Sequence, residues 1–232
     1  MNALLVVARE PIPGKTKTRL SPPLTPDEAA QLYEMFLLDT LEIMRQVEDV
    51  RRFIVYLPRE ANGYFRKLAP DFELLPQQGP TLGARLDNAL KQCLNSECDH
   101  AVIMDSDSPS LPSEYVQQAF STLKTSDGVI GPCDDGGYYL IGLNRPAPSL
   151  LREVQMSTNN VTQDTLALAE KEGLRMVQLP MWYDVDNGKE LSHLYSNLHS
   201  LPSECAPHTR AFLAELWPNL KDHSRGGYPI QS

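Results

Sequence analysis

The sequence predicts an α/β fold, a three-layer α/β/α, Rossmann-like domain built on a mostly parallel mixed sheet. Short apolar runs typical of buried strands alternate along the chain with segments of helical periodicity. Strands joined by helices pair in parallel through right-handed crossovers, which places helices on both faces of the sheet. The stretch 128–143 carries two strand-like runs with no helix between them, so it predicts one antiparallel excursion.

The first half of the chain opens with a strand and a helix. Residues 3–8 (ALLVVA) form a continuous apolar run, as expected of a strand covered on both faces. After a proline-rich loop, Thr25, Pro26 and Glu28 predict a helix start with a capping box, and one face of that helix should pack on the sheet. The elements expected next are a strand at 52–57, a helix at 60–68, a strand at 72–75, a helix at 81–94 and a strand at 100–104.

The second half continues the alternation. We expect a helix at 112–123, strands at 128–132 and 138–143 around a Gly-Gly turn, a helix at 161–172, a strand at 174–179 and helices at 189–198 and 209–216. We predict one domain over residues 1–199 and a C-terminal helical tail, residues 200–232, packed on the same domain.

Composition excludes several classes of function. The net charge of −9 over 232 residues argues against a nucleic-acid polymer as partner, because a polyanion would be repelled. No stretch approaches the roughly 20 apolar residues of a membrane span, and the apolar start is too short for a signal peptide, so a cytoplasmic location is expected. The cysteines form no C-x-x-C and read as scattered thiols of an intracellular protein rather than as a zinc site; they are Cys93, Cys98, Cys133 and Cys205.

A basic loop follows the first predicted strand. Ligands of open α/β sheets bind beyond the carboxyl ends of the strands, and this loop should lie there. Gly14 would let backbone N–H groups approach an anion, and the cations could neutralise phosphate charge. A Walker A loop is excluded, because a glycine should stand at the position of Arg9 and because prolines prevent a helix directly after the lysine. A solvated charged loop is the alternative. Its cations are Arg9, Lys15, Lys17 and Arg19.

Two acidic pairs follow predicted strands. Asp105 and Asp107 come directly after a buried strand and project to the same side of an extended chain, so they can share one Mg²⁺. The alternative is that they are turn or capping residues. Asp186, in the second pair, could complete the metal shell or act as a base, or else Asp186 or Asn187 caps the next helix.

Two further segments carry candidate functional groups. The turn around Asp135 could place a carboxylate where it orients an acceptor hydroxyl or takes its proton, although turn chemistry alone explains its glycines. Gly83 and Arg85 open a helix whose N-terminus would favour an anion, and an ordinary helix start is the alternative.

In this order, several segments resemble a family of bacterial proteins in the nucleotide-diphospho-sugar transferase superfamily, with the GT-A fold, usually described as uncharacterised glycosyltransferases. The matching segments are residues 11–20, 82–85, 105–109, 131–139, 157–158 and 184–186. The same architecture is similar to that of guanylyl- and cytidylyltransferases that make cofactor precursors. One departure is Ser108, where relatives often carry cysteine.

The resemblance implies a divalent cation, Mg²⁺ or Mn²⁺, at Asp105 and Asp107. It also implies a nucleotide bound over the first half of the sheet and an acceptor facing the segment 131–139. Within that segment the acceptor-binding candidates are Gly136, Gly137 and Tyr138.

The leading hypothesis is therefore a metal-dependent transferase that uses a nucleotide-activated donor, in its glycosyltransferase form releasing a nucleoside diphosphate from the sugar. The alternative is a nucleotidyltransferase that condenses a nucleoside triphosphate with a small phosphorylated acceptor and releases pyrophosphate, and a further alternative is a non-catalytic nucleotide-binding module. The partners are a nucleotide or nucleotide-sugar and a small-molecule acceptor. The oligomeric state stays open, with a homodimer as one option.

Each candidate residue has an assigned role under this hypothesis. The catalytic candidates are Lys15, Arg19 and Asp135. The nucleotide-binding candidates are Arg9, Gly14, Lys15, Lys17, Arg19, Gly83, Arg85 and Asp105. The metal ligands are Asp105, Asp107 and Asp186.

Overall fold

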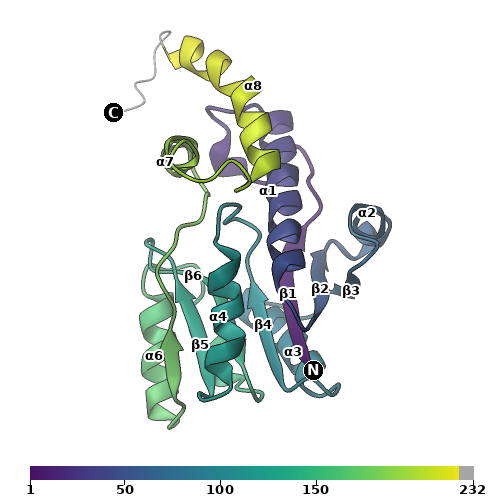
Figure 1. The fold of residues 1–232 in the computed structure, drawn as a ribbon, viewed down its shortest axis with the longest axis vertical. Helices are drawn as coiled ribbons and strands as arrows, with labels where there is room; N and C mark the ends of the chain where they lie inside the picture. The colour runs from purple at the N-terminus through teal and green to yellow at the C-terminus, as the bar shows by residue number, and fades with distance from the viewer. Residues whose placement is uncertain (225–232) are drawn as a thin grey trace. The chain divides into compact units, whose positions relative to one another are not determined.

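The fold is seen in a computed structural model, which describes residues 1–224 (Figure 1). Contacts between residues divide the chain into two compact units. The first unit contains Met1–Glu10, Ile43–Ser106 and Leu111–Tyr183. The second contains Pro11–Glu42, Asp107–Ser110 and, among the described residues, 184–224.

The first unit is built on a seven-stranded sheet with the order β3-β2-β1-β4-β6-β5-β7. Only β6 is antiparallel to its neighbours, β4 and β5, and every other pair is parallel. The prediction of a mostly parallel mixed sheet with one antiparallel excursion is therefore confirmed. The strands are β1 (Asn2–Arg9), β2 (Val50–Leu57), β3 (Glu73–Pro76), β4 (His100–Met104), β5 (Gly128–Pro132), β6 (Tyr138–Leu143) and β7 (Met176–Gln178).

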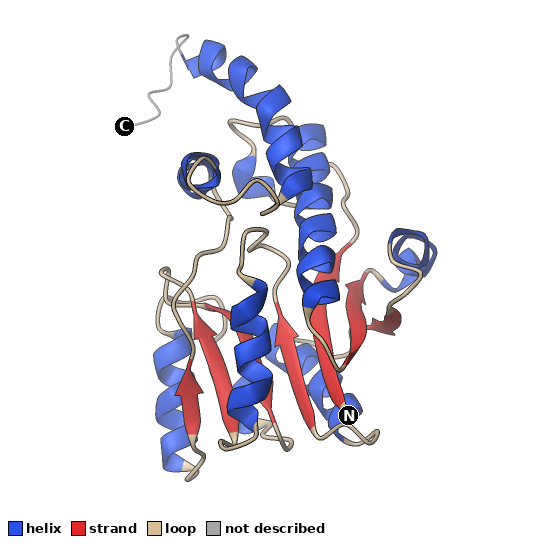
Figure 2. Ribbon diagram, in the orientation of Figure 1, coloured by secondary structure: helices blue, strands red, loops and turns tan. Residues whose placement is uncertain are grey.

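Helices cover both faces of this sheet, which confirms the three-layer α/β/α arrangement (Figure 2). Ala101 and Ile103 of β4 belong to a core that also contains buried residues of α3, α5 and α6. Val102 lies on the opposite face, where Leu123 of α4 also packs, and Figure 1 shows α4 over the near face. The helices of the first unit are α2 (Asn62–Leu68), α3 (Leu82–Leu94), α4 (Ser113–Leu123), α5 (Ser149–Arg152) and α6 (Val161–Lys171).

The parallel pairing brings several strand ends to one edge of the sheet. β1 and β2 end together at Arg9 and Leu57, and the parallel strand β4 ends at Met104, in register with Val6 of β1, so the three strands point to the same edge. Because β4 and β5 are both antiparallel to β6, β5 ends at the same edge. We call this the carboxyl edge, and the ends of β1, β4 and β5 define it.

The second unit is largely helical. It contains most of α1 (Pro26–Gln46), the short η1 (Thr18–Leu20), α7 (Gly188–Leu198) and α8 (Pro207–Ser224). The predicted capping box is present, because Thr25 Oγ1 accepts from Glu28 N at 3.2 Å and the Glu28 carboxylate accepts from Thr25 N at 2.8 Å. Tyr195 of α7 stacks on Trp217 of α8 at 3.9 Å between ring centroids.

The predicted elements are present, with ends that shift by a few residues. The helix expected at 60–68 is divided into η2 (Arg59–Ala61) and α2. Periodicity missed the short helices η1 and α5, which are too short to show a helical repeat. Within residues 1–224, no helix is long and apolar enough to cross a membrane. The division into a domain over residues 1–199 and a tail over residues 200–232 stays a prediction, and residues 225–232 lie outside the described part of the chain.

The N-terminus of α8 is held by a buried carboxylate. Asp39 of α1, 2% exposed, accepts hydrogen bonds from the backbone N–H of His208 at 3.0 Å and of Thr209 at 2.8 Å. These N–H groups belong to the first turn of α8 and have no acceptor within their own helix. Asp39 therefore supplies the acceptors that this helix start requires.

We expect Asp39→Ala to lower the free energy of unfolding by about 2 kcal/mol, because two buried donors lose a charged acceptor. Asp39→Asn keeps one acceptor oxygen and should cost less. Urea unfolding of both variants and of the wild type measures the difference. Equal stability of the alanine and asparagine variants would contradict this account of the helix start.

Candidate active site

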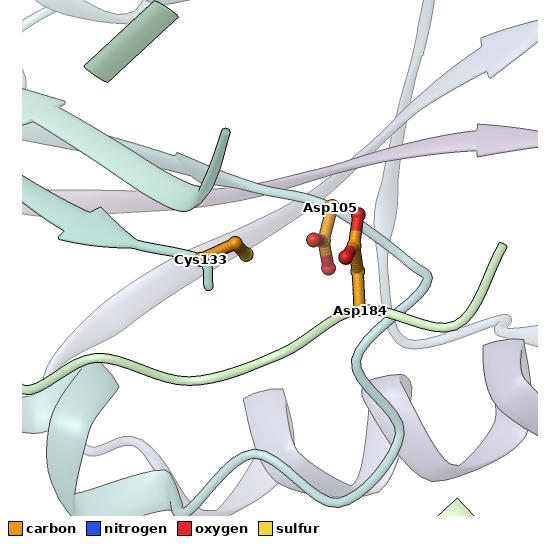
Figure 3. A group of neighbouring side chains, drawn as sticks. All are labelled: Asp105, Cys133 and Asp184. Atoms are coloured by element: carbon orange, nitrogen blue, oxygen red, sulfur yellow. The ribbon is translucent and has the colours of Figure 1, made fainter. Parts of the chain in front are cut away.

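Two side chains meet where β4 and β5 end, at the carboxyl edge of the first unit. Asp105 directly follows β4, and its backbone N–H donates to Tyr139 O at 2.9 Å. Cys133 directly follows β5, is buried, and donates through its backbone N–H to Gly137 O at 2.9 Å. A carboxylate oxygen of Asp105 and the Cys133 sulfur lie within 4.8 Å of each other (Figure 3). Figure 3 also labels Asp184, which belongs to the second unit.

The pKa of Tyr139 depends on its burial and on the groups near Asp105 and Cys133. Its hydroxyl donates to Pro180 O at 2.9 Å. Burial raises the pKa of Tyr139 above its ordinary value, and nearby Cys133, Tyr115 and Asp105 raise it further. Burial is the largest cause of this shift, and the negative charge of Asp105 acts in the same direction.

Cys133 is the residue that sequence reasoning missed. Its thiol was interpreted as one of several scattered cysteines. Its position immediately after a strand, like that of Asp105, was the available signal, because both strands run in the same direction.

Two arginines, Arg9 and Arg85, place positive charge at the carboxyl edge. Arg9 is the last residue of β1, and Arg85 lies in the first turn of α3, where Thr81 Oγ1 accepts from Ala84 N at 3.2 Å. The Arg85 Nε atom is buried and has no hydrogen-bond partner among the described residues. Burial lowers the pKa of Arg85, and the charge of Arg9 lowers it further. A buried donor near a second cation, at a helix start, is an arrangement suited to an anion.

Gly83, by contrast, has a packing role. A Cβ atom placed there would lie 1.7 Å from Leu151 O, so a side chain would push α5 away from α3. The structure therefore explains this glycine without a ligand, and its nucleotide-binding role stays a prediction.

The Asp135 turn is held by its own hydrogen bonds. Asp135 is exposed, and its Oδ1 accepts from Gly137 N at 2.7 Å. Gly136 has φ +91°, and a Cβ there would lie 1.9 Å from Asn159 O, so only glycine fits. The hydroxyl of the next residue, Tyr138, donates to Met156 Sδ at 3.7 Å, and burial raises the pKa of that hydroxyl.

A cleft of about 520 Å³ lies beside this turn, entirely within the first unit. Asp134, Asp135 and Gly136 line it on one side, and Asn159 and Thr162 line it near the start of α6. The predicted acceptor-facing segment therefore borders a space large enough for a small molecule.

In the second unit, Lys17 lies between two aspartates that sequence analysis assigned to metal. Its Nζ is 2.8 Å from Asp107 Oδ1 and 2.7 Å from Asp186 Oδ1, and it also donates to Val185 O at 2.6 Å. The Lys17 side chain is only 6% exposed, whereas that of Arg19 is 77% exposed and reaches Asp186 at 3.7 Å. The opening loop and both acidic segments thus come together in this unit.

The charges of this group stabilise each other. Burial alone would lower the pKa of Lys17, but Asp107 and Asp186 outweigh burial and raise it. Burial alone would raise the pKa of Asp186, but Lys17 and Arg19 outweigh burial and lower it. Lys17 and Asp186 are therefore both charged at neutral pH.

Asp186 and Asn187 were both expected as possible caps of the next helix, and the structure confirms Asn187 and not Asp186. Asn187 is the N-cap of α7, accepting from Lys189 N at 3.0 Å and Glu190 N at 3.2 Å, and Glu190 completes a capping box. Asp186 is thereby left to pair with the cations of the opening loop.

Gly14 and Lys15 of that loop are exposed, whereas Thr16, between Lys15 and Lys17, is buried. Gly14 has φ +73°, and Lys15, whose backbone N–H donates to Ile12 O at 3.0 Å, has an exposed side chain. Lys15 is not part of the ion-pair group around Lys17, so the structure joins Lys17 and Arg19, but not Lys15, to the acidic residues. The catalytic, nucleotide-binding and metal-binding roles of these residues stay predictions.

The lowered pKa of Asp186 predicts an acid-sensitive contribution to stability. A carboxyl whose pKa in the folded state is below its ordinary value of 3.8 stabilises the fold above that pH, and the contribution is lost as the pH falls through the folded-state pKa. The stability difference between wild type and Asp186→Asn should therefore be constant near neutral pH and shrink below pH 3.8. Urea unfolding over a pH series measures it, and a difference that persists unchanged in acid would contradict the pairing.

Comparison with known proteins places the chain in a family. Residues 40–158, just over half of the chain, match a family described as "Uncharacterized protein conserved in bacteria (DUF2064)". No curated protein matches significantly. Among solved structures, a "putative nucleotide-diphospho-sugar transferase" from Desulfovibrio desulfuricans G20 is 32% identical, with 96% of this chain and 97% of that chain covered and a TM-score of 0.89.

More distant structures share the fold. CMP:2-keto-3-deoxy-manno-octonic acid synthetase complexed with CTP is 10% identical, with 86% of this chain and 98% of that chain covered and a TM-score of 0.56. Rv0371c from Mycobacterium tuberculosis H37Rv, in complex with manganese, is 15% identical, with 83% and 96% covered and a TM-score of 0.55. The resemblance inferred from the sequence is confirmed, and the chain belongs to the DUF2064 family of bacterial proteins.

Proposed function

We propose that this chain is a metal-dependent transferase that uses a nucleotide-activated donor, in the first place a nucleotide-diphospho-sugar. One observation carries the proposal: β1 ends in Arg9, which lies near Arg85, and Asp105 directly follows the adjacent parallel strand β4. Cationic groups suited to phosphates and a carboxylate suited to a metal ion therefore share the carboxyl edge of one sheet.

The cationic residues would bind the donor phosphates. Arg85 has a buried, unpartnered Nε–H, so a bound phosphate oxygen would satisfy a donor that is otherwise left without an acceptor. Arg9 and the exposed Lys15 and Arg19 would add positive charge, and Gly14 would allow close backbone approach. Charge on the leaving group would then be stabilised as the bond to it breaks.

The acidic residues would hold a divalent cation, Mg²⁺ or Mn²⁺. Asp105 presents a carboxylate at the strand end, and Asp107 follows two residues later in the chain. In the second unit, Asp107 and Asp186 direct one oxygen each at a single positive charge, that of Lys17. A bound ion would supply Lewis-acid stabilisation of phosphate oxygens.

The acceptor would bind beside the Asp135 turn. The cleft there is bordered by Asp134, Asp135 and Gly136, and a carboxylate at such a place can orient a hydroxyl or take its proton. Gly137 and Tyr138 continue this segment. Neither of them lines the cleft, and the buried Tyr138 hydroxyl, which donates to Met156, supports a packing role rather than one in proton transfer.

The relatives support a transferase. One is described as a nucleotide-diphospho-sugar transferase, another was solved with CTP, and a third with manganese. We therefore infer nucleotide use for this chain, and we choose Mn²⁺ for the experiments. The thiol of Cys133, within 4.8 Å of an Asp105 oxygen, also favours a transition-metal ion over Mg²⁺.

Nucleotidyl transfer is the second candidate. The opening loop carries several cations, and a nucleoside triphosphate brings more negative charge to neutralise than a nucleotide sugar does. In that reaction an acceptor phosphate attacks the α-phosphorus, and pyrophosphate leaves. A non-catalytic nucleotide-binding module would bind nucleotide without releasing either product.

We also propose a cytoplasmic location. None of the four cysteines forms a disulfide in the structure, as expected of a reducing compartment.

Product analysis tests the proposed function. Incubated with Mn²⁺, nucleotide sugars and nucleoside triphosphates, the protein should release nucleoside diphosphate in glycosyl transfer or pyrophosphate in nucleotidyl transfer. Asp105→Asn should reduce turnover by at least about 10- to 100-fold, the loss typical even for the hydrogen-bonding partner of a metal ligand. Asp164→Asn, the same change at an exposed position of α6, serves as the control. If nucleotide binds without metal and neither product is released, the chain is a non-catalytic nucleotide-binding module and the proposed transferase function is wrong.

Arg85→Met tests the anion site separately. Because the Nε atom of Arg85 is buried without a partner, removing it should leave the free energy of unfolding unchanged or raise it by up to about 1 kcal/mol. The same variant should bind pyrophosphate and UDP more weakly. Chemical denaturation and calorimetry measure the two effects, with Arg66→Met on the exposed face of α2 as the control. Unchanged binding together with lost stability would mark Arg85 as a structural residue.

A further inference from the structure

The ammonium group of Lys17 is fully coordinated by protein oxygens. An ammonium has three N–H donors, and the Lys17 Nζ has three acceptors: Asp107 Oδ1 at 2.8 Å, Asp186 Oδ1 at 2.7 Å and Val185 O at 2.6 Å. The Phe36 ring lies beside it, with its centroid 5.9 Å from Nζ. With a side chain only 6% exposed, this lysine has no donor left for a phosphate.

The backbone fixes each partner in this position. Lys17 has φ 49°, in the left-handed region, and begins η1 by accepting from Leu20 N at 2.9 Å. The segments that carry the aspartates are joined to each other, because Val185 N donates to Asp107 O at 3.0 Å. Asp186 is followed directly by the N-cap Asn187 of α7. The lysine therefore meets two carboxylates whose positions are set by secondary structure.

The charges of the Asp107 and Asp186 carboxylates suit a single cation placed between them. Two carboxylates directed at one point carry a charge of −2, which Lys17 reduces to −1 and which exposed Arg19, 3.7 Å from Asp186, offsets further. Without the lysine, the same two oxygens would present a pair of carboxylates to a divalent ion, as Mg²⁺ and Mn²⁺ sites do. The lysine thus occupies a place that a metal ion would otherwise suit.

We propose that Lys17 is a built-in cation that replaces a divalent ion between Asp107 and Asp186. It is then a positioning residue, which orients both acidic segments of the second unit, and Asp186 is its partner rather than a metal ligand. In the opening loop, the exposed Lys15 and Arg19 would then bind phosphate, and Lys17 would not. This refines the residue roles of the proposed function, but it rests on the geometry of the second unit alone.

The test converts the lysine position into a metal site. Lys17→Met keeps most of the length of the side chain and removes its charge, so Asp107 and Asp186 lose the cation that they share. We expect the variant to be less stable than wild type in EDTA, and Mn²⁺ to raise its melting temperature by several degrees more than that of wild type. Electron paramagnetic resonance titration should show one more bound Mn²⁺ per chain than in wild type.

Two control variants keep the test decisive. Lys15→Met, the same change at an exposed position of the same loop, should leave the Mn²⁺ stoichiometry and the Mn²⁺-induced stabilisation at wild-type levels. The double variant Lys17→Met/Asp186→Asn removes one of the two carboxylates and should lose the extra Mn²⁺ bound by Lys17→Met. If Lys17→Met is unfolded in EDTA, folding on addition of Mn²⁺ is the expected result.

The proposal is overturned if Lys17→Met binds no more Mn²⁺ than wild type and gains no extra stability from it. It is also overturned if Asp186→Asn in the wild-type background weakens Mn²⁺ binding, because Asp186 would then be a metal ligand. Neither measurement involves a nucleotide or a product. Failure here therefore leaves the proposed function standing, and absence of product in the transfer assays leaves the role of Lys17 standing.

Discussion

The common direction of β1, β4 and β5 is the constraint on which the candidate site depends. Parallel strands end at the same edge of a sheet, so the residues that follow them are brought together without any help from loops. β6 provides the connection, since it runs antiparallel between β4 and β5 and lets both point the same way. Asp105 and Cys133 owe their proximity to this arrangement.

The two units differ in how they accommodate a buried cationic side chain. In the first, Arg85 is partly buried near another cation and keeps a donor without an acceptor, an arrangement that costs stability unless an anion binds. In the second, Lys17 is buried with every donor used and with two carboxylates as partners. The first pattern is typical of a group kept for a ligand, and the second of a group that completes the fold.

Local signals made much of this fold predictable. The apolar run at residues 3–8, the Thr25 capping box and the helix-free stretch 128–143 each specify local structure or its connection, and each was found as expected. The pairing of Lys17 with Asp186 was not predictable, because 169 residues separate them and no periodicity links them. The same applies to Gly83, whose neighbour at Leu151 is brought close only by helix packing.

The outermost strands of the sheet have a consequence for self-association. β3 has four residues and β7 has three, and prolines stand at the end of β3 (Pro76) and two residues beyond β7 (Pro180). A short edge strand flanked or ended by proline, which has no backbone N–H group, pairs poorly with a strand of another chain. Two copies of this protein would therefore not join by continuing one sheet into the next, and a dimer would have to form through helices or loops.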